Sequence, residues 1–330
     1  MKRRSGMLAS LLLFLGVAAS ISSTAVAQSS SAQPYPSKNI SFVVTYPPGS
    51  VVDVAARIIA AEIEPILGET VIVENKPGAD TAIAYDYVAT RQPADGHTFV
   101  LSFVQGWASL PLLGQNLRFD PLKDLIPVMD IAESRLIMGS AAKFPWNTMQ
   151  EFVAAAKADP GKYNYGVGSS LTKIMMEGFT KDFGIEAVQV PFAGGGPWTT
   201  ALGQGVVEIG LISEGAALSL GDRLTALAVT GAERAENFPD APTFVELGYP
   251  NYRNLTISIG ARAGTPPVAI ETLHAAVAQV LQKPEVQEKF RGAGLMVSAN
   301  STPETAARAL SEQASFFASV AAVTASAAKK

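Results

Sequence analysis

The residues with the chemistry to hold a ligand lie in loops that follow apolar runs. After the β-branched and aromatic run 40–46, a Pro-Pro-Gly turn leads to Ser50, which can cap a helix with Asp53 as its capping-box partner. The backbone N–H groups of residues 49–52 would then stand at a helix N-terminus, where open α/β sheets bind anions. An ordinary helix cap without a ligand fits the same residues, so both interpretations stay open.

Three later loops offer similar groups. Residues 166–172 place the hydroxyls of Ser169, Ser170 and Thr172 between glycines and an expected helix, a set of neutral donors suited to a carboxylate. The glycine-rich loop 191–198 and the stretch 213–215 each close an expected strand, and Glu214 is expected to face solvent. Ser and Thr are also common helix caps, so a purely structural role explains these hydroxyls equally well.

Catalytic and metal-binding patterns fail on this sequence. The two histidines, His97 and His274, have no HxxxH or HExxH spacing, and the chain contains no cysteine. The GxG at residues 166–168 lacks the third glycine of a dinucleotide fingerprint, and Leu211 stands where a GxSxG elbow around Ser213 needs glycine. We therefore expect no catalytic site, no metal and no cofactor, and an enzyme acting on carboxylic acids remains the weaker alternative.

Alternating strands and helices must position these loops. The predicted strands are 40–46, 70–73, 98–103, 163–166, 187–190, 206–212 and 225–230, and the predicted helices are 52–67, 81–91, 147–158, 267–282 and 303–323. This βαβ rhythm predicts an α/β fold with mainly parallel sheets flanked by helices.

Two apolar stretches, within 120–140 and at 255–260, interrupt the rhythm and are predicted to cross between two lobes. With a tail after the second crossing, the first lobe would be discontinuous, residues 39–133 plus 255–330, and residues 134–254 would form an inserted second lobe. That layout is typical of a type II-like two-lobe binding protein with its ligand cleft between the lobes.

The N-terminus and the composition indicate export. Three basic residues, the apolar run 7–18 and Ala25-Val-Ala27 predict a signal peptide over 1–27, followed by a Ser/Gln/Pro-rich leader over 28–38. The apolar run is shorter than the roughly 20 residues that a membrane-spanning helix needs. With a net charge of −4 and no basic cluster, the chain is not expected to bind nucleic acid, and we expect a monomer.

The order of the loops resembles the Bug family, the extracytoplasmic solute-binding proteins of tripartite tricarboxylate transporter systems, from about Tyr35 to the C-terminal helix. The matching phrases include Tyr46-Pro-Pro-Gly49 with Asp53, Val73-Glu-Asn-Lys-Pro-Gly-Ala79, Ala94-Asp-Gly-His-Thr98, Phe119-Asp-Pro-Leu-Lys-Asp124 and Phe238-Pro-Asp-Ala-Pro-Thr243. The resemblance implies a periplasmic protein that closes over a small carboxylated solute and delivers it to the membrane subunits of such a transporter. A receptor that presents its ligand to a membrane sensor would need the same fold.

The resemblance also implies which residues bind the ligand. The matching positions are Tyr46, Gly49, Ser50 and Asp53 on the first lobe and Ser169, Ser170, Thr172 and Gly194 on the second. We add Trp107, Ala193 and Ser213 to the predicted ligand-binding residues, because they lie near these loops in the sequence.

Departures from the family pattern bear on the ligand. A glycine pair near Ala79 is replaced by Asp80-Thr81, and apolar residues stand at Val52, Ala193 and Ile212. These apolar residues predict a carboxylate with a larger apolar or aromatic body. Trp107 and Trp198 lie nearby in sequence, although a packing role is the commoner one for tryptophan.

Overall fold

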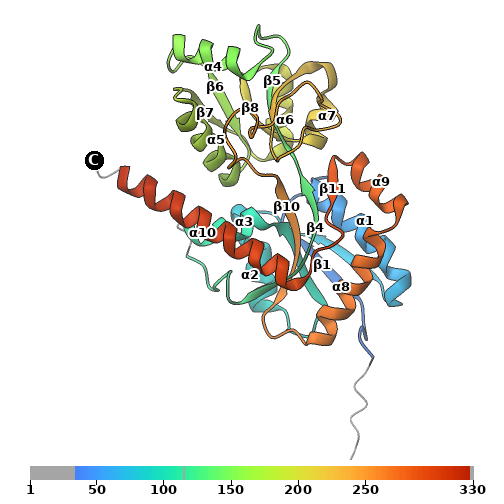
Figure 1. The fold of residues 1–330 in the computed structure, drawn as a ribbon. Coiled ribbons are helices and arrows are strands. Elements are labelled where there is room, and N and C mark those ends of the chain that lie inside the picture. The colour runs from blue at the N-terminus through green and yellow to red at the C-terminus, as the bar shows by residue number, and fades with distance from the viewer. Residues whose placement is uncertain (1–33, 114–115, 328–330) are drawn as a thin grey trace, which may run out of the picture. The chain divides into compact units, whose positions relative to one another are not determined.

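Helices flank two separate β-sheets in the computed structural model (Figure 1). The structure describes residues 34–113 and 116–327, with residues 319–327 by their backbone alone. The predicted signal peptide and most of the predicted leader lie outside these ranges. Residues 35–330 form one compact unit by their contacts, and this unit is described below.

The first sheet has six strands in the order β11-β4-β10-β3-β1-β2. Their bounds are β1 Ile40–Val44, β2 Val71–Asn75, β3 Thr98–Phe103, β4 Leu125–Ser134, β10 Leu255–Arg262 and β11 Leu295–Val297. Strand β1 pairs in parallel with β2 and β3, so their carboxyl ends share one edge of the sheet. The loops that follow these three strands are therefore neighbours.

The second sheet has five strands in the order β7-β6-β8-β5-β9. Their bounds are β5 Leu136–Ala141, β6 Asn164–Val167, β7 Val188–Pro191, β8 Ile209–Ser213 and β9 Leu224–Val229. Only Arg135 separates β4 of the first sheet from β5 of the second, and the chain returns to the first sheet at β10. The two crossings thus occur in the stretches where the sequence predicted them.

The α/β two-lobe fold class is confirmed, but the prediction of mainly parallel sheets is wrong, because both sheets are mixed. Strand β10 is antiparallel to both β3 and β4, and β5 is antiparallel to both β8 and β9. Parallel neighbours need a crossover of a dozen or more residues, usually a helix. Strands β5 and β10 are instead the strands by which the chain enters each sheet from the other one, so neither is joined to its predecessor by a βαβ crossover within one sheet.

The helices largely follow the sequence pattern. Their bounds are α1 Val51–Leu67, α2 Ala82–Asp86, α3 Val104–Ser109, α4 Met149–Ala158, α5 Ser170–Phe183, α6 Gly195–Gln204, α7 Glu214–Leu220, α8 Pro267–Leu281, α9 Pro284–Gly292 and α10 Pro303–Ala327. Helix α9 and strand β11 were not predicted. The predicted helix 81–91 is broken into a 3-10 turn (Ala79–Thr81), α2 and a π turn (Tyr87–Arg91), because Thr81 has a left-handed backbone.

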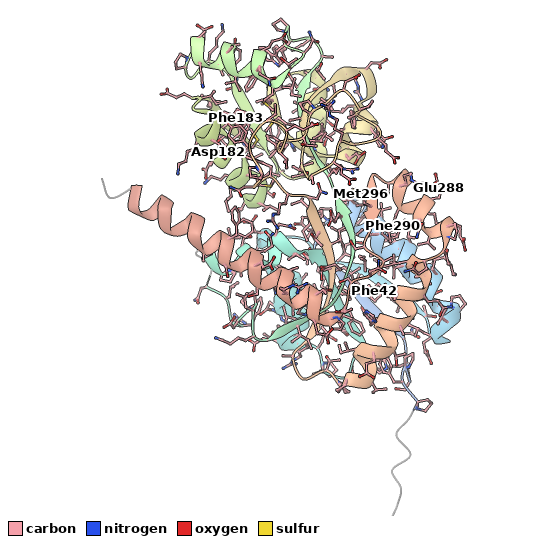
Figure 2. All side chains as sticks on the ribbon, in the orientation of Figure 1. Phe42, Asp182, Phe183, Glu288, Phe290 and Met296 are labelled. Atoms are coloured by element: carbon pink, nitrogen blue, oxygen red, sulfur yellow. The ribbon has the colours of Figure 1, made fainter. Side chains whose placement is uncertain are left out.

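Aromatic and aliphatic side chains fill the space between sheets and helices (Figure 2). Phe42 of β1 and Phe290 of α9 are fully buried, and Phe42 packs edge-on against Phe99 with ring centroids 6.3 Å apart. Phe183 stacks on Tyr249 at 4.1 Å. Among the described helices, none combines the length and apolar character needed to cross a membrane.

Candidate functional site

The loop after β1 is held by the carboxylate of Asp53. This buried carboxylate accepts hydrogen bonds from the backbone N–H of Gly49 (2.9 Å) and from the side chains of Asn75 (2.8 Å) and Arg57 (3.1 Å). The side-chain amide of Asn75 also donates to the Tyr46 carbonyl at 3.0 Å. Burial alone would raise the pKa of Asp53, but these hydrogen bonds and the guanidinium charge hold it below its usual range.

Ser50 caps α1 as predicted, because its hydroxyl accepts the N–H of Asp53 at 3.2 Å. The reciprocal half of the predicted capping box differs, since the Asp53 carboxylate takes the N–H of Gly49 instead of that of Ser50. Gly49 has a φ of +82°, which glycine adopts without strain. The Asp53 carboxylate thus accepts its hydrogen bonds from protein groups and holds the shape of the loop. Ser50 and Gly49 are part of that loop.

Hydroxyl groups gather at the shared carboxyl edge of β1, β2 and β3. A Cβ atom built on Gly106 would lie 3.4 Å from the Tyr46 hydroxyl, 3.9 Å from Ser102 Oγ and 4.0 Å from Thr81 Cγ2. Thr81 is 6% exposed, and its hydroxyl has no hydrogen-bond partner among the described residues. A buried polar group usually has a partner, so the unpaired Thr81 hydroxyl is a candidate donor to a ligand or a water molecule.

Tyr85 adds a further, more deeply buried hydroxyl to this cluster of side chains. Its side chain is fully buried, and the Ser102 hydroxyl interacts with its phenol and partly offsets the effect of burial on the pKa of Tyr85. Burial raises the pKa values of Tyr46 and Tyr85 well above the usual range, so both phenols stay protonated and can donate. Thr81, Tyr85 and Ser102 were not predicted, although Ser102 is conspicuous as a hydroxyl residue near the end of an apolar strand.

The loops of the second sheet lie close to one another. Ser169 caps α5 in a capping box with Thr172, whose hydroxyl accepts the N–H groups of Gly168 (3.2 Å) and Ser169 (3.1 Å). A Cβ atom on Gly168 would lie 3.0 Å from the backbone of Gly194, so the loop before α6 is a direct neighbour. The loops before α5 and α6 are therefore direct neighbours.

Two contacts join the loops of the first sheet to those of the second. The Asp80 carboxylate, in the loop after β2, accepts the N–H of Ser170 at 3.2 Å and its hydroxyl at 2.7 Å. At the other contact, a Cβ atom on Gly215 would meet the carbonyl oxygen of Ala293 at 2.7 Å and Val51 Cγ1 at 3.8 Å. The start of α5 therefore contacts the loop after β2, and the start of α7 lies beside the start of α1.

The Asp80 loop is strained. Ala79, Asp80 and Thr81 have consecutive φ values of 45°, 47° and 79°, in the left-handed region that side chains with a Cβ atom seldom adopt. Strained backbone persists only where surrounding structure holds it, and it concentrates at functional sites. The strain, the interlobe hydrogen bonds and the unpaired Thr81 hydroxyl all fall within three residues.

Other predicted residues have structural roles. Trp107 is 1% exposed and donates its ring N–H to the Pro121 carbonyl at 2.7 Å, so it belongs to the core rather than to a surface facing a ligand. Ser213 caps α7 by accepting the N–H of Ala216 at 3.2 Å. Ala193 is exposed at the edge of the Gly194 loop.

The expectation that Glu214 faces solvent is wrong. Its side chain is buried, accepts a hydrogen bond from Asn237 at 2.9 Å and lies 3.8 Å from the Arg135 guanidinium. The two arginines nearest the loops are thus both paired with carboxylates, Arg135 with Glu214 and Arg57 with Asp53. The candidate site therefore offers neutral donors.

The described part of the chain contains no group of three or more His, Cys, Asp or Glu side chains arranged to bind a metal ion. His97 accepts the N–H of Ser37 at 3.2 Å and packs 5.0 Å from the Tyr35 ring, while His274 pairs with the Ser301 carbonyl at 2.9 Å. Each histidine thus contacts protein groups.

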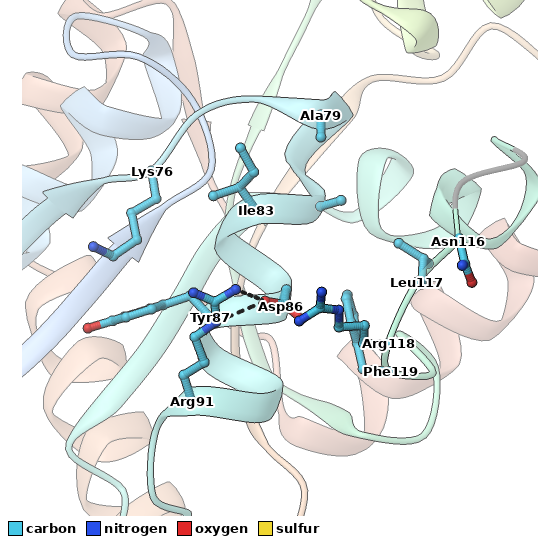
Figure 3. A pocket seen from close by; sticks show the side chains of 11 residues that line it. Lys76, Ala79, Ile83, Asp86, Tyr87, Arg91, Asn116, Leu117, Arg118 and Phe119 are labelled. Atoms are coloured by element: carbon cyan, nitrogen blue, oxygen red, sulfur yellow. Dashed lines mark hydrogen bonds and ion pairs between the residues drawn. The ribbon is translucent and has the colours of Figure 1, made fainter.

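Two cavities in the described part of the chain lie away from the predicted residues. One, of about 600 Å³, is lined by Lys76, Ala79, Tyr87, Arg91 and Arg118 among others, and Arg91 is paired with Asp86 at 2.8 Å (Figure 3). The other, of about 440 Å³, is lined by residues of the connection before β10 and of α10. None of the eleven predicted residues lines either cavity.

Comparison with known proteins decides the family. The sequence model for the tripartite tricarboxylate transporter family receptor matches residues 55–315. The chain belongs to this receptor family. This receptor is 31% identical to Protein BugT of Bordetella pertussis over 290 residues, covering 86% of this chain and 88% of BugT.

Solved structures agree with this assignment. The receptor superimposes on an R. palustris protein with adipate (28% identity, TM-score 0.79), covering 87% of this chain and 97% of that one. It superimposes equally on MatC from Rhodopseudomonas palustris with bound malate (25% identity, TM-score 0.78), covering 87% and 100% of the two chains. The receptor therefore has the two-lobe fold of these binding proteins.

Proposed function

We propose that this receptor captures a small carboxylated solute in the periplasm and delivers it to the membrane subunits of a tripartite tricarboxylate-type transporter. The observation that carries the proposal is the buried hydroxyl of Thr81, which has no hydrogen-bond partner among the described residues and belongs to a side chain whose methyl group lies near Gly106 and the Tyr46 hydroxyl. A solute carboxylate placed there would accept hydrogen bonds from neutral donors, as in sites that bind anions without a cation.

Three features support a carboxylate. The phenols of Tyr46 and Tyr85 are kept protonated by burial, and the first turn of α1 brings the positive end of its dipole to the same edge. The nearby Arg57 and Arg135 are already paired with protein carboxylates. Relatives of this fold hold adipate and malate.

The prediction of an aromatic or large apolar body loses most of its support. Val52 is fully buried under α1, and Ile212 is 3% exposed within the second core, so neither side chain faces the loops. Only Ala193 remains as an exposed apolar substitution. We therefore propose a carboxylate without assigning it an aromatic body.

Isothermal calorimetry of the mature protein with aliphatic, amino and aromatic carboxylates tests the proposal, together with a Thr81→Val variant. Valine keeps the β-branched shape and removes only the hydroxyl, so the melting temperature should hold while affinity falls about tenfold, the loss of one buried hydrogen bond. Thr200→Val, at an exposed position of α6, is the matched control and should bind normally. A carboxylate that binds both variants as tightly as the unmodified protein would contradict the proposed site.

Delivery is tested separately by uptake of the labelled solute into membrane vesicles that contain the transporter subunits. Uptake should require the receptor and should saturate with receptor concentration. A ligand-dependent complex with a membrane sensor, without uptake, would favour the presenting role instead.

A further inference from the structure

The N-terminus of α5 already carries a carboxylate, that of Asp80. Its two oxygens accept both the backbone N–H and the hydroxyl of Ser170. The Ser170 hydroxyl is one of the donors that were predicted to bind a ligand carboxylate. The positive end of the α5 dipole is therefore matched by a protein charge, and a second anion at this place would meet like-charge repulsion.

The charge of Asp80 also acts on the cluster of hydroxyl side chains (Tyr46, Thr81 and Ser102) at the edge of the first sheet. Its negative charge adds to burial in raising the pKa of Tyr46, and Asp80 directly precedes Thr81 in the same strained turn. Asp80 is exposed, and its position is fixed between the strained backbone of residues 79–81 and Ser170. A solute anchored at Thr81 would extend from the neutral donors toward this fixed negative charge.

We propose that Asp80 is a specificity-determining residue, which excludes solutes with a second carboxylate and selects monocarboxylates whose other end is a hydrogen-bond donor, such as a hydroxyl, amide or ammonium group. This inference rests on the proposed function and deepens it by naming the solute class. Discrimination here uses repulsion against the wrong solute as well as attraction for the right one. A donor at the distal end would share the Asp80 carboxylate with Ser170, whereas a second carboxylate would compete for the same donors.

The test compares solutes of equal length that differ only at the distal end. Adipate, 6-hydroxyhexanoate and 6-aminohexanoate form one series, and terephthalate with 4-(hydroxymethyl)benzoate forms another. Calorimetry with the unmodified protein should show at least about tenfold tighter binding of a distal donor than of the matching dicarboxylate. Asp80→Asn removes the charge but can still accept from Ser170, and it should reduce the preference to less than about threefold.

Ser170→Ala is the control that separates the effect of the Asp80 charge from the effect of the hydrogen bond between Asp80 and Ser170. It removes the hydroxyl that binds Asp80 but leaves the carboxylate in place, so overall affinity can fall while the preference for the distal donor persists. A dicarboxylate that binds the unmodified protein as tightly as its donor counterpart would overturn the inference, and so would a preference unchanged in Asp80→Asn. Failure of every carboxylate to bind, with the protein folded, would overturn the proposed function itself and the inference with it.

Discussion

Asp53 is the residue on which the loop after β1 depends. Asp53→Ala would leave the N–H of Gly49 and the amide of Asn75 without their carboxylate partner, so we expect the free energy of unfolding to fall by about 1–3 kcal/mol. Urea denaturation measures the change. Asp53→Asn is the matched control, since it keeps one acceptor oxygen and should lose less. Equal stability of all three proteins would show that the carboxylate does not hold the loop.

The ionisation of Asp53 gives stability a defined dependence on pH. Its pKa is lower in the folded protein than its ordinary value of 3.8, so the folded state favours the ionised form. The contribution is complete above the ordinary value and is lost as the pH falls through the lower folded value. Melting curves between pH 2 and pH 6 should show this acid loss in the unmodified protein and a smaller one in Asp53→Asn.

At the scale of single residues, helix caps could be predicted from the sequence, but unusual backbone conformations could not. Ser50 and Ser169 were predicted at helix starts, and each is a cap, because hydroxyl residues after apolar runs signal this geometry reliably. Ser213 was predicted only to close a strand, and it also caps a helix. The roles of Asp80 and Thr81 could not be predicted, since nothing in their residue types announces a left-handed backbone. Side-chain direction was also hidden, as Val52 and Trp107 show by facing the core.

At the scale of elements, the packing of α6 on the second sheet depends on two glycines beneath Trp198. A Cβ atom on Gly166 of β6 would lie 2.0 Å from the indole ring, and one on Gly210 of β8 would lie 2.2 Å from it. Gly166→Ala should therefore lower the free energy of unfolding by about 1–3 kcal/mol. Gly195→Ala, on α6 itself, meets nothing within 4 Å and should leave the urea midpoint unchanged. Equal midpoints for both variants would argue against this packing.

The strained segment before α2 leads to the opposite expectation. Ala79→Gly should raise the free energy of unfolding by about 1 kcal/mol, because glycine adopts a φ of 45° without the steric cost of a Cβ atom. Thermal melting of the two proteins measures the gain. Solute affinity should not rise with it, since a looser loop holds Asp80 less firmly. A lower melting temperature in the variant would show that the alanine backbone is not under strain.

Over the whole molecule, the close approach of Gly215 and Ala293 limits how near the two sets of loops can come. A Cβ atom on Gly215 would collide with a backbone carbonyl, which cannot rotate away as a side chain can. Gly215→Ala should thus disfavour the arrangement in which the loops meet and weaken solute binding about three- to tenfold, with little change in melting temperature. Gly292→Ala, which meets nothing within 4 Å, is the control. Unchanged affinity in Gly215→Ala would mean that binding tolerates a wider separation.

The two crossings were predictable because long apolar strands interrupt a regular alternation of strands and helices. The direction of pairing was not predictable, since β5 and β10 have the same composition whether their neighbours run parallel or antiparallel. Long-range contacts decide it, such as the paired register of Ile137 with Ile212 and Val229. The lobe boundaries at residues 134 and 254 remain a prediction.

The two ends of the second-sheet segment meet. Leu136 donates its N–H to the Thr230 hydroxyl at 2.9 Å and accepts the N–H of Thr230 at 3.0 Å, so the stretch between them begins and finishes at one point. Because its ends meet, this stretch has the layout of an insertion, whose loops can change in sequence without moving the strands where it begins and ends. New solute preferences could then arise within this set of loops while the strands of the first sheet stay as they are.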